Sequence, residues 1–139
     1  MKKCSKCPAY FDGKRWIYKL KREPIKIKKG EYSIELCPGC EKIEKKWIEG
    51  IVQIRGNFWK KHKEEVEKLV QHTAERKRER TPAARIYRFV KEKDELIIET
   101  TDRALAERIG KDLEKAFSGE LDIQWLKKAE YSRVYWQKD

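Results

Sequence analysis

The C-terminal two thirds of the chain alternates between strand-like and helix-like patterns of hydrophobic residues. Residues 47–55 are β-branched and alternating, which predicts a strand with one side formed by Ile48, Val52 and Ile54. Asn57 is a favourable N-cap, and apolar residues then recur at helical spacing, which predicts a helix over about 58–78. The pair Thr81-Pro82 is expected to end this helix.

The following pattern predicts a hairpin, a second helix and two last strands. The hairpin joins strands at 85–90 and 95–100, and Thr101 or Asp102 caps the second helix, which ends at Ser118-Gly119. Its expected buried stripe consists of Leu105, Ile109, Leu113, Ala116 and Phe117. The last strands are expected near 120–127 and 130–137.

This order of elements predicts an α+β fold. Strand, helix, strand, strand, helix, strand matches the ferredoxin-like split βαβ, with helices on one face of the sheet, the other face free and one extra C-terminal strand. We assign residues 47–139 to this domain and residues 1–46 to a small separate module, with strands expected in 10–22 and 31–36.

The four cysteines form two Cys-x-x-Cys pairs with 29 residues between them: Cys4, Cys7, Cys37 and Cys40. Two such loops supply the four sulfurs that tetrahedral zinc prefers. Pro38 and Gly39 suit the tight second loop. We therefore predict a zinc ribbon with one structural Zn²⁺ per chain, whose binding supplies folding free energy that a small, lysine-rich module lacks.

Two alternative roles for the cysteines are structural disulfides and redox-active dithiols. Structural disulfides are rare in reducing compartments. A thioredoxin-like dithiol normally begins a helix within a βαβ unit, and the sequence gives no obvious helix after either pair. Because four thiolates close a tetrahedral site, the predicted metal is structural, with thiol redox chemistry as the alternative.

The positive charge is unevenly distributed. The formal net charge is +11, with 42% charged residues, and residues 1–30 alone carry eleven basic and two acidic side chains. Residues 31–91 carry a net +5 and residues 92–139 a net −3. Basic residues interleaved with aromatic ones indicate a polyanion, and unpaired RNA bases in particular. The candidate RNA contacts are Lys14, Arg15, Trp16, Lys19, Lys21, Arg22, Lys26, Lys28 and Lys29, and secondarily Arg55, Arg76, Arg78 and Arg85.

No pattern of a catalytic site is present in the sequence. His62 and His72 lie ten residues apart on one predicted helix, and no nucleophile–base pair, phosphate loop or metal–carboxylate motif occurs. No apolar run reaches the length of a membrane span and no signal-peptide stretch is recognised, so we expect a cytoplasmic protein without a small-molecule substrate. The Lys- and Glu-rich composition, with one Asn and one Met, is typical of thermophile proteins.

With the cysteine pairs, the strand Gly-Ile-Val-Gln-Ile-Arg-Gly at 50–56 resembles the N-terminal half of the nonsense-mediated decay protein 3 family, the large-ribosomal-subunit export adaptors and their archaeal relatives. The segments at 99–109 and 132–136 also look like the family's strand, Ala-rich helix and closing strand. The family usually carries more cysteines, further β-domains and, in eukaryotes, a Leu-rich export tail, which this chain lacks. The resemblance therefore implies binding to ribosomal RNA or the ribosome, without nuclear export.

Together these features predict a non-enzymatic zinc protein that binds ribosomal RNA or the ribosome, with the large subunit favoured, as a ribosomal protein or assembly factor in ribosome biogenesis. A protein-interaction or transcription-related zinc-ribbon adaptor using the free sheet face is one alternative. A thiol oxidoreductase using the two Cys-x-x-Cys pairs is the other.

Overall fold

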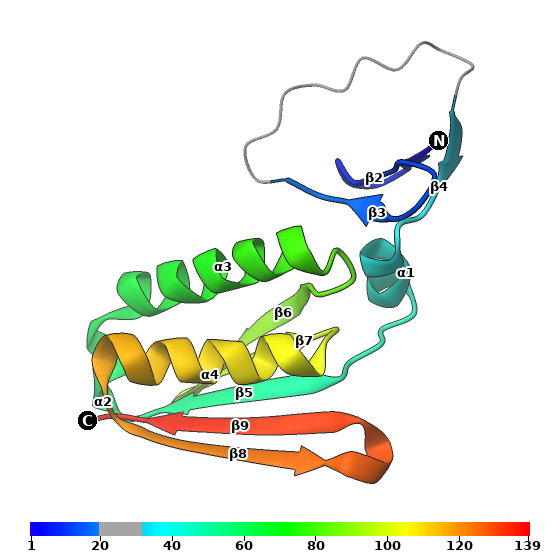
Figure 1. Ribbon diagram of the computed structural model, residues 1–139. Helices are drawn as coiled ribbons and strands as arrows, with labels where there is room; N and C mark the ends of the chain where they lie inside the picture. The colour runs from blue at the N-terminus through cyan, green and yellow to red at the C-terminus, as the bar shows by residue number, and fades with distance from the viewer. Residues whose placement is uncertain (20–31) are drawn as a thin grey trace.

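The computed structural model describes residues 1–19 and 32–139, which form two mixed sheets and four α-helices (Figure 1). The N-terminal sheet has the order β3-β2-β1-β4, and the C-terminal sheet the order β6-β7-β5-β9-β8. The predicted α+β class is therefore confirmed. The zinc ribbon and the division at residue 46 stay predictions.

The N-terminal unit consists of a sheet of very short strands followed by one short helix. Strand β1 pairs antiparallel with β2 and parallel with β4, and β2 pairs antiparallel with β3. Strands of two or three residues bury little apolar surface, so this sheet needs another source of stability. The elements are β1 Lys2–Cys4, β2 Tyr10–Phe11, β3 Trp16–Ile17, β4 Ser33–Glu35 and α1 Pro38–Glu44.

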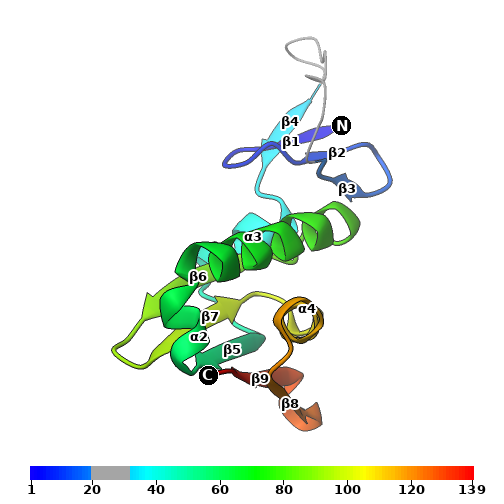
Figure 2. The same cartoon turned by 90° about the vertical axis from the view of Figure 1, so that its left-hand side faces the viewer.

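The C-terminal unit packs its two long helices on one face of the five-stranded sheet, as the sequence predicts (Figures 1 and 2). Alternation along β5 buries Val52 and Ile54 completely, beneath Val66 and Val70 of α3 and Leu105 of α4 in one apolar core. The elements are β5 Gly50–Arg55, α2 Asn57–Lys61, α3 Lys63–Arg80, β6 Ile86–Lys91, β7 Glu95–Thr100, α4 Arg103–Phe117, β8 Glu120–Leu126, η1 Lys127–Ala129 and β9 Tyr131–Gln137.

The sheet order departs from a ferredoxin-like sheet with an added edge strand. That arrangement would place β8 beside β5 and β9 at the edge. Instead β9 lies beside β5, in parallel, and β8 is the edge strand, paired with β9 as a hairpin. The order of elements along the chain is as predicted, but the ferredoxin-like fold is not confirmed.

Local boundaries differ from the predictions at four places. The first strand begins at Gly50 rather than residue 47, and the first long helix is divided at His62, which ends α2 and caps α3. Gly56, not Asn57, is the N-cap of α2. Ala116 of the expected buried stripe is exposed and lines the open groove between α3 and α4, whereas Phe117 packs against the core. No helix in the described part is long and apolar enough to cross a membrane.

Candidate metal centre and cation surface

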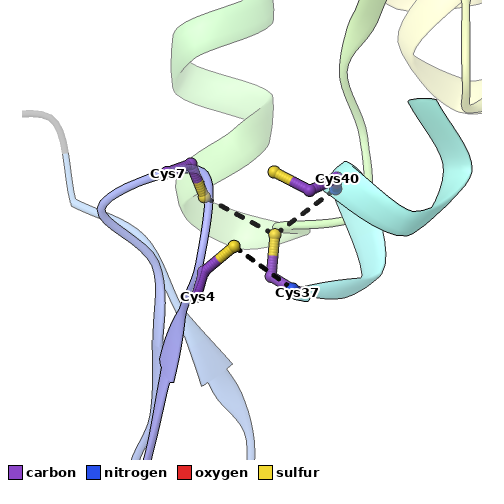
Figure 3. Close-up of side chains that lie close together, drawn as sticks. All are labelled: Cys4, Cys7, Cys37 and Cys40. Carbon is purple, nitrogen blue, oxygen red and sulfur yellow. Dashed lines mark hydrogen bonds between the residues drawn. The ribbon is translucent and has the colours of Figure 1, made fainter. Parts of the chain in front are cut away.

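The four cysteine sulfurs converge between the two units, with all four Sγ atoms within 4.8 Å of one another (Figure 3). Cys4 ends β1 and Cys7 lies in the turn that follows, while Cys37 and Cys40 belong to the first turn of α1. The Sγ atoms of Cys7 and Cys37 are 3.5 Å apart. The two sequence pairs, far apart along the chain, therefore form one cluster.

Backbone pairing brings the two loops together. Strands β1 and β4 run parallel, and Ser5 N–H donates to the Glu35 carbonyl at 3.1 Å. The two cysteine-bearing segments therefore reach the cluster side by side. The amide of Cys37 donates to Cys4 Sγ at 3.3 Å, and that of Ala9 donates to Cys7 Sγ at 3.4 Å. Such amide donors favour negative charge on sulfur.

The second pair begins a helix, which corrects the expectation from the sequence. Cys37 is the N-cap of α1, and its Sγ accepts from the Cys40 amide at 3.4 Å. Pro38 suits the first helical turn because its missing N–H would be unpaired there. This helix is followed by β5 of the other sheet, so it is not part of a βαβ unit as in a thioredoxin-like site.

The cluster fits a tetrahedral metal ion. Zinc–sulfur bonds of about 2.3 Å give a tetrahedron whose edges are about 3.8 Å, close to the spacing of these sulfurs. Cys4, Cys37 and Cys40 are buried and Cys7 is partly buried. Buried thiols that lie this close together and accept backbone hydrogen bonds are suited to bind a metal as thiolates.

Sulfur–sulfur contacts and burial perturb the cysteine pKa values. A hydrogen bond from Cys37 lowers the pKa of Cys7 from 9.0 to about 4. The same contact, followed by burial, raises the pKa of Cys37, and burial raises the pKa of Cys40. Without a bound cation, such a cluster is expected to carry one thiolate, which the neighbouring sulfurs share through hydrogen bonds.

Arg85 places a positive charge against the sulfurs. Its Nη1 donates to Cys40 Sγ at 3.2 Å, although the residues are 45 positions apart. Two lysines near the cysteines in the sequence are engaged elsewhere: Lys6 pairs with Glu44, and Lys42 contacts Glu49 and the Thr101 carbonyl. The guanidinium of Arg85 is thus engaged with the cluster.

The N-terminal candidate contacts divide into exposed cations and one packed aromatic residue. Lys14, Arg15 and Lys19 are exposed. Lys14 and Arg15 lie in a turn that Asp12 stabilises, because its Oδ1 accepts hydrogen bonds from both of their backbone amides, at 2.8 and 3.0 Å. Trp16 packs against the cysteine cluster. Lys21, Arg22, Lys26, Lys28 and Lys29 lie outside the described residues.

The secondary candidates do not form one surface. Arg55 pairs with Glu95 at 2.8 Å on the sheet face away from the helices, and Arg76 lies 3.9 Å from Asp112 on α4. Arg78 stacks over the ring of Tyr18, 3.8 Å from its centroid. Tyr18 Oη in turn donates to Glu75 at 2.8 Å, so burial and Glu75 raise its pKa. Arg78 and Tyr18, which the sequence did not single out as a pair, attach the N-terminal unit to α3.

The histidines form no metal-binding group within the described residues. His62 stacks on Phe58 with 4.4 Å between ring centroids and lies 3.3 Å from Glu65, while His72 is exposed. Among residues 1–19 and 32–139, the four cysteines are the group of side chains that lie close enough together to hold a metal ion.

Comparison with family models, with curated proteins and with solved structures finds no match. The resemblance to the nonsense-mediated decay protein 3 family therefore depends on the cysteine pairs and the short segments quoted above. What the geometry establishes is a cluster of four cysteines compatible with a structural metal ion.

Proposed function

We propose that this chain is a non-enzymatic zinc protein that binds ribosomal RNA or the ribosome, as a ribosomal protein or an assembly factor. The observation that carries the proposal is the attachment of a basic hairpin to the cysteine cluster. Lys14, Arg15 and Lys19 lie exposed on or beside strands β2 and β3, whose sheet encloses the sulfurs. A metal ion would stabilise this small sheet and hold its cations in place.

Charge supports a polyanionic partner. The chain carries a net +11, and most of the excess falls in its first 30 residues. Lysine and arginine that contact phosphates release condensed counterions, which gives sequence-independent affinity for RNA. The resemblance to a ribosome-associated family favours the large ribosomal subunit as the partner.

Zinc is the metal that this donor set favours, and it would be structural. Four thiolates complete a tetrahedral shell, which leaves no open position for a substrate or an activated water. A thiol oxidoreductase with two separate dithiols is less consistent with the geometry, because the sulfurs of both pairs meet in a single cluster.

A protein-interaction adaptor is the second candidate, and one observation supports it. The sheet face opposite α3 and α4 carries no helix in the described structure (Figure 2). Its side chains are mixed: the ion pair of Arg55 and Glu95 lies next to the cross-strand pair of Gln53 and Ile97. Because this face is not continuously apolar, the adaptor function is the weaker of the two.

Co-sedimentation with purified ribosomal subunits over a salt series tests the proposal, together with zinc analysis of the purified protein. We expect one zinc per chain and binding that weakens steeply between about 50 and 200 mM salt. The variant Lys14→Gln/Arg15→Gln/Lys19→Gln should bind more weakly than a control with the same net charge, Lys61→Gln/Lys93→Gln/Lys128→Gln. Binding that is independent of salt would contradict the proposal.

A further inference from the structure

Helices α3 and α4 lie side by side and leave an open groove of about 980 Å³ between them. The helices run in opposite directions, so the C-terminal half of α3 lies beside the N-terminal half of α4 (Figure 1). The groove is lined by residues of these two helices only. It is separate from the cysteine cluster and from the hairpin discussed above.

Both helices place cations along the groove. Its lining includes three basic residues from each helix: Arg76, Lys77 and Arg80 from α3, and Arg108, Lys111 and Lys115 from α4. Residues three or four apart share one face of a helix, with a rise of about 6 Å for four residues. The groove is therefore bordered by two rows of positive charge at short, regular intervals.

The acidic residues of the groove do not cancel this charge. Three acidic residues line it, against six basic ones. Asp112 accepts from Thr73 at 2.8 Å and pairs with Arg108 at 2.9 Å, and Glu107 accepts from Ser132 at 3.0 Å. Within the described parts of the chain, four of the cations form no ion pair: Lys77, Arg80, Lys111 and Lys115.

We propose that this groove binds the phosphate backbone of an RNA strand, and the inference rests on the proposed RNA-binding function. Four cations without ion pairs, on facing sides of one groove, match the repeated charges of such a backbone. Leu69, Ala104 and Ala116 are the apolar residues of the lining, too few for an amphipathic peptide helix to bury its face. The charge and the shortage of apolar surface both favour phosphate.

The basic hairpin contacts the same end of α3, but on another side of the helix. Tyr18 Oη donates to Glu75, which directly precedes Arg76, and Lys19 follows Tyr18 in the chain. Glu75 and Arg78, which contact Tyr18, do not line the groove, so the hairpin cations and the groove are two separate surfaces.

Fluorescence anisotropy with a labelled 20-nucleotide poly(U) tests the groove directly. The test variant is Lys77→Gln/Arg80→Gln/Lys111→Gln/Lys115→Gln. The matched control, Lys61→Gln/Lys93→Gln/Lys127→Gln/Lys128→Gln, removes the same charge from exposed residues that do not line the groove. Circular dichroism checks that both variants retain the fold. We expect the test variant to bind at least about tenfold more weakly than the control, with a log–log salt slope shallower by about 3.

Each outcome decides the inference separately from the proposed function. If the wild type binds RNA and the two variants bind equally, the groove proposal is wrong and the proposed function stands. If the wild type binds neither poly(U) nor ribosomal subunits, both are wrong. If the wild type binds poly-glutamate of equal charge more tightly than poly(U), and the test variant loses the poly-glutamate binding but keeps the poly(U) binding, the groove takes an acidic peptide instead, and the proposal is overturned.

Discussion

Arg85 donates a hydrogen bond from Nη1 to Sγ of Cys40 at 3.2 Å, and thereby joins the cysteine cluster to the loop between α3 and β6. Gly39 lies against the same loop, where an added Cβ would meet the Pro82 carbonyl oxygen at 2.6 Å. A guanidinium beside sulfur favours the thiolate form and holds it in position. The N-terminal unit is thus attached to the C-terminal one through its cysteine cluster.

Replacement of Arg85 by Ala is expected to weaken metal retention by about 10- to 100-fold, because the partners of ligating atoms contribute to affinity at this level. Zinc release to a competing chelator measures the effect. Arg85→Lys should recover part of it, since lysine keeps the charge but not the planar donor group. Arg88→Ala is the control, because it removes an arginine paired with Glu99 on the other sheet. Equal zinc retention in Arg85→Ala and Arg88→Ala would refute this role.

Metal removal is expected to disorder the N-terminal unit and to leave the C-terminal one folded. Strands of two or three residues bury little apolar surface, whereas the C-terminal unit has a core of fifteen buried residues. Amide NMR spectra after chelation, or of Cys7→Ser, should lose the dispersed signals of residues 2–17 and 33–44 and keep those of 50–137. Ser5→Ala, in the same loop, should bind one zinc and keep all signals. If chelation abolishes the dispersed signals of both units together, the C-terminal unit does not fold independently of the metal, which would contradict this prediction.

The sequence predicts those parts of the fold that depend on local periodicity. Asp102 caps α4 as predicted, accepting from the Leu105 amide at 2.9 Å, and Leu105, Ile109 and Leu113 are completely buried. The insertion of β9 between β5 and β8 is not predictable in this way, because strand order depends on pairing between distant segments. Helix α1 was missed because it has seven residues, with Gly39 among them.

The candidate site shows the same division between local and distant information. The spacing of the cysteines predicts their convergence, since a Cys-x-x-Cys loop brings two sulfurs together locally. The contact of Arg85 with Cys40 spans 45 residues and has no local signal. Lys111 and Lys115 are not predicted as RNA contacts, because residues 92–139 carry a net charge of −3. This regional sum does not reveal that the basic residues of α4 line one groove.

Tyr18→Phe is expected to lower the free energy of unfolding by about 1 kcal/mol at neutral pH. The hydroxyl donates to the Glu75 carboxylate, and the partly exposed site reduces the usual value of a hydrogen bond to a charged group. Burial and Glu75 raise the pKa of Tyr18, so its contribution is complete below about pH 10 and is lost as the pH rises through the folded-state pKa. Denaturant unfolding of both proteins at several pH values measures the difference.

Tyr10→Phe is the matched control for this prediction. Tyr10 lies on β2 of the same sheet, and its hydroxyl forms no hydrogen bond among the described residues. Its removal should change stability by less than about 0.5 kcal/mol at any pH. A difference between Tyr18→Phe and wild type that stays constant up to pH 11 or above would argue against the Tyr18–Glu75 bond.

Gly110→Ala is expected to destabilise the C-terminal unit by about 1–3 kcal/mol, although alanine is the better helix former by about 1 kcal/mol. Gly110 allows α4 to approach the sheet closely, since an added Cβ would lie 2.4 Å from Val134 Cγ1 and 2.9 Å from Leu121 Cδ1. These atoms belong to β9 and β8, so the helix would have to move away from the inserted strand and its partner. Thermal unfolding measures the effect, with Glu114→Ala on the exposed side of α4 as the control. If Gly110→Ala is as stable as the control, α4 can shift at little cost, and close packing at this position does not determine how the helix sits on β9.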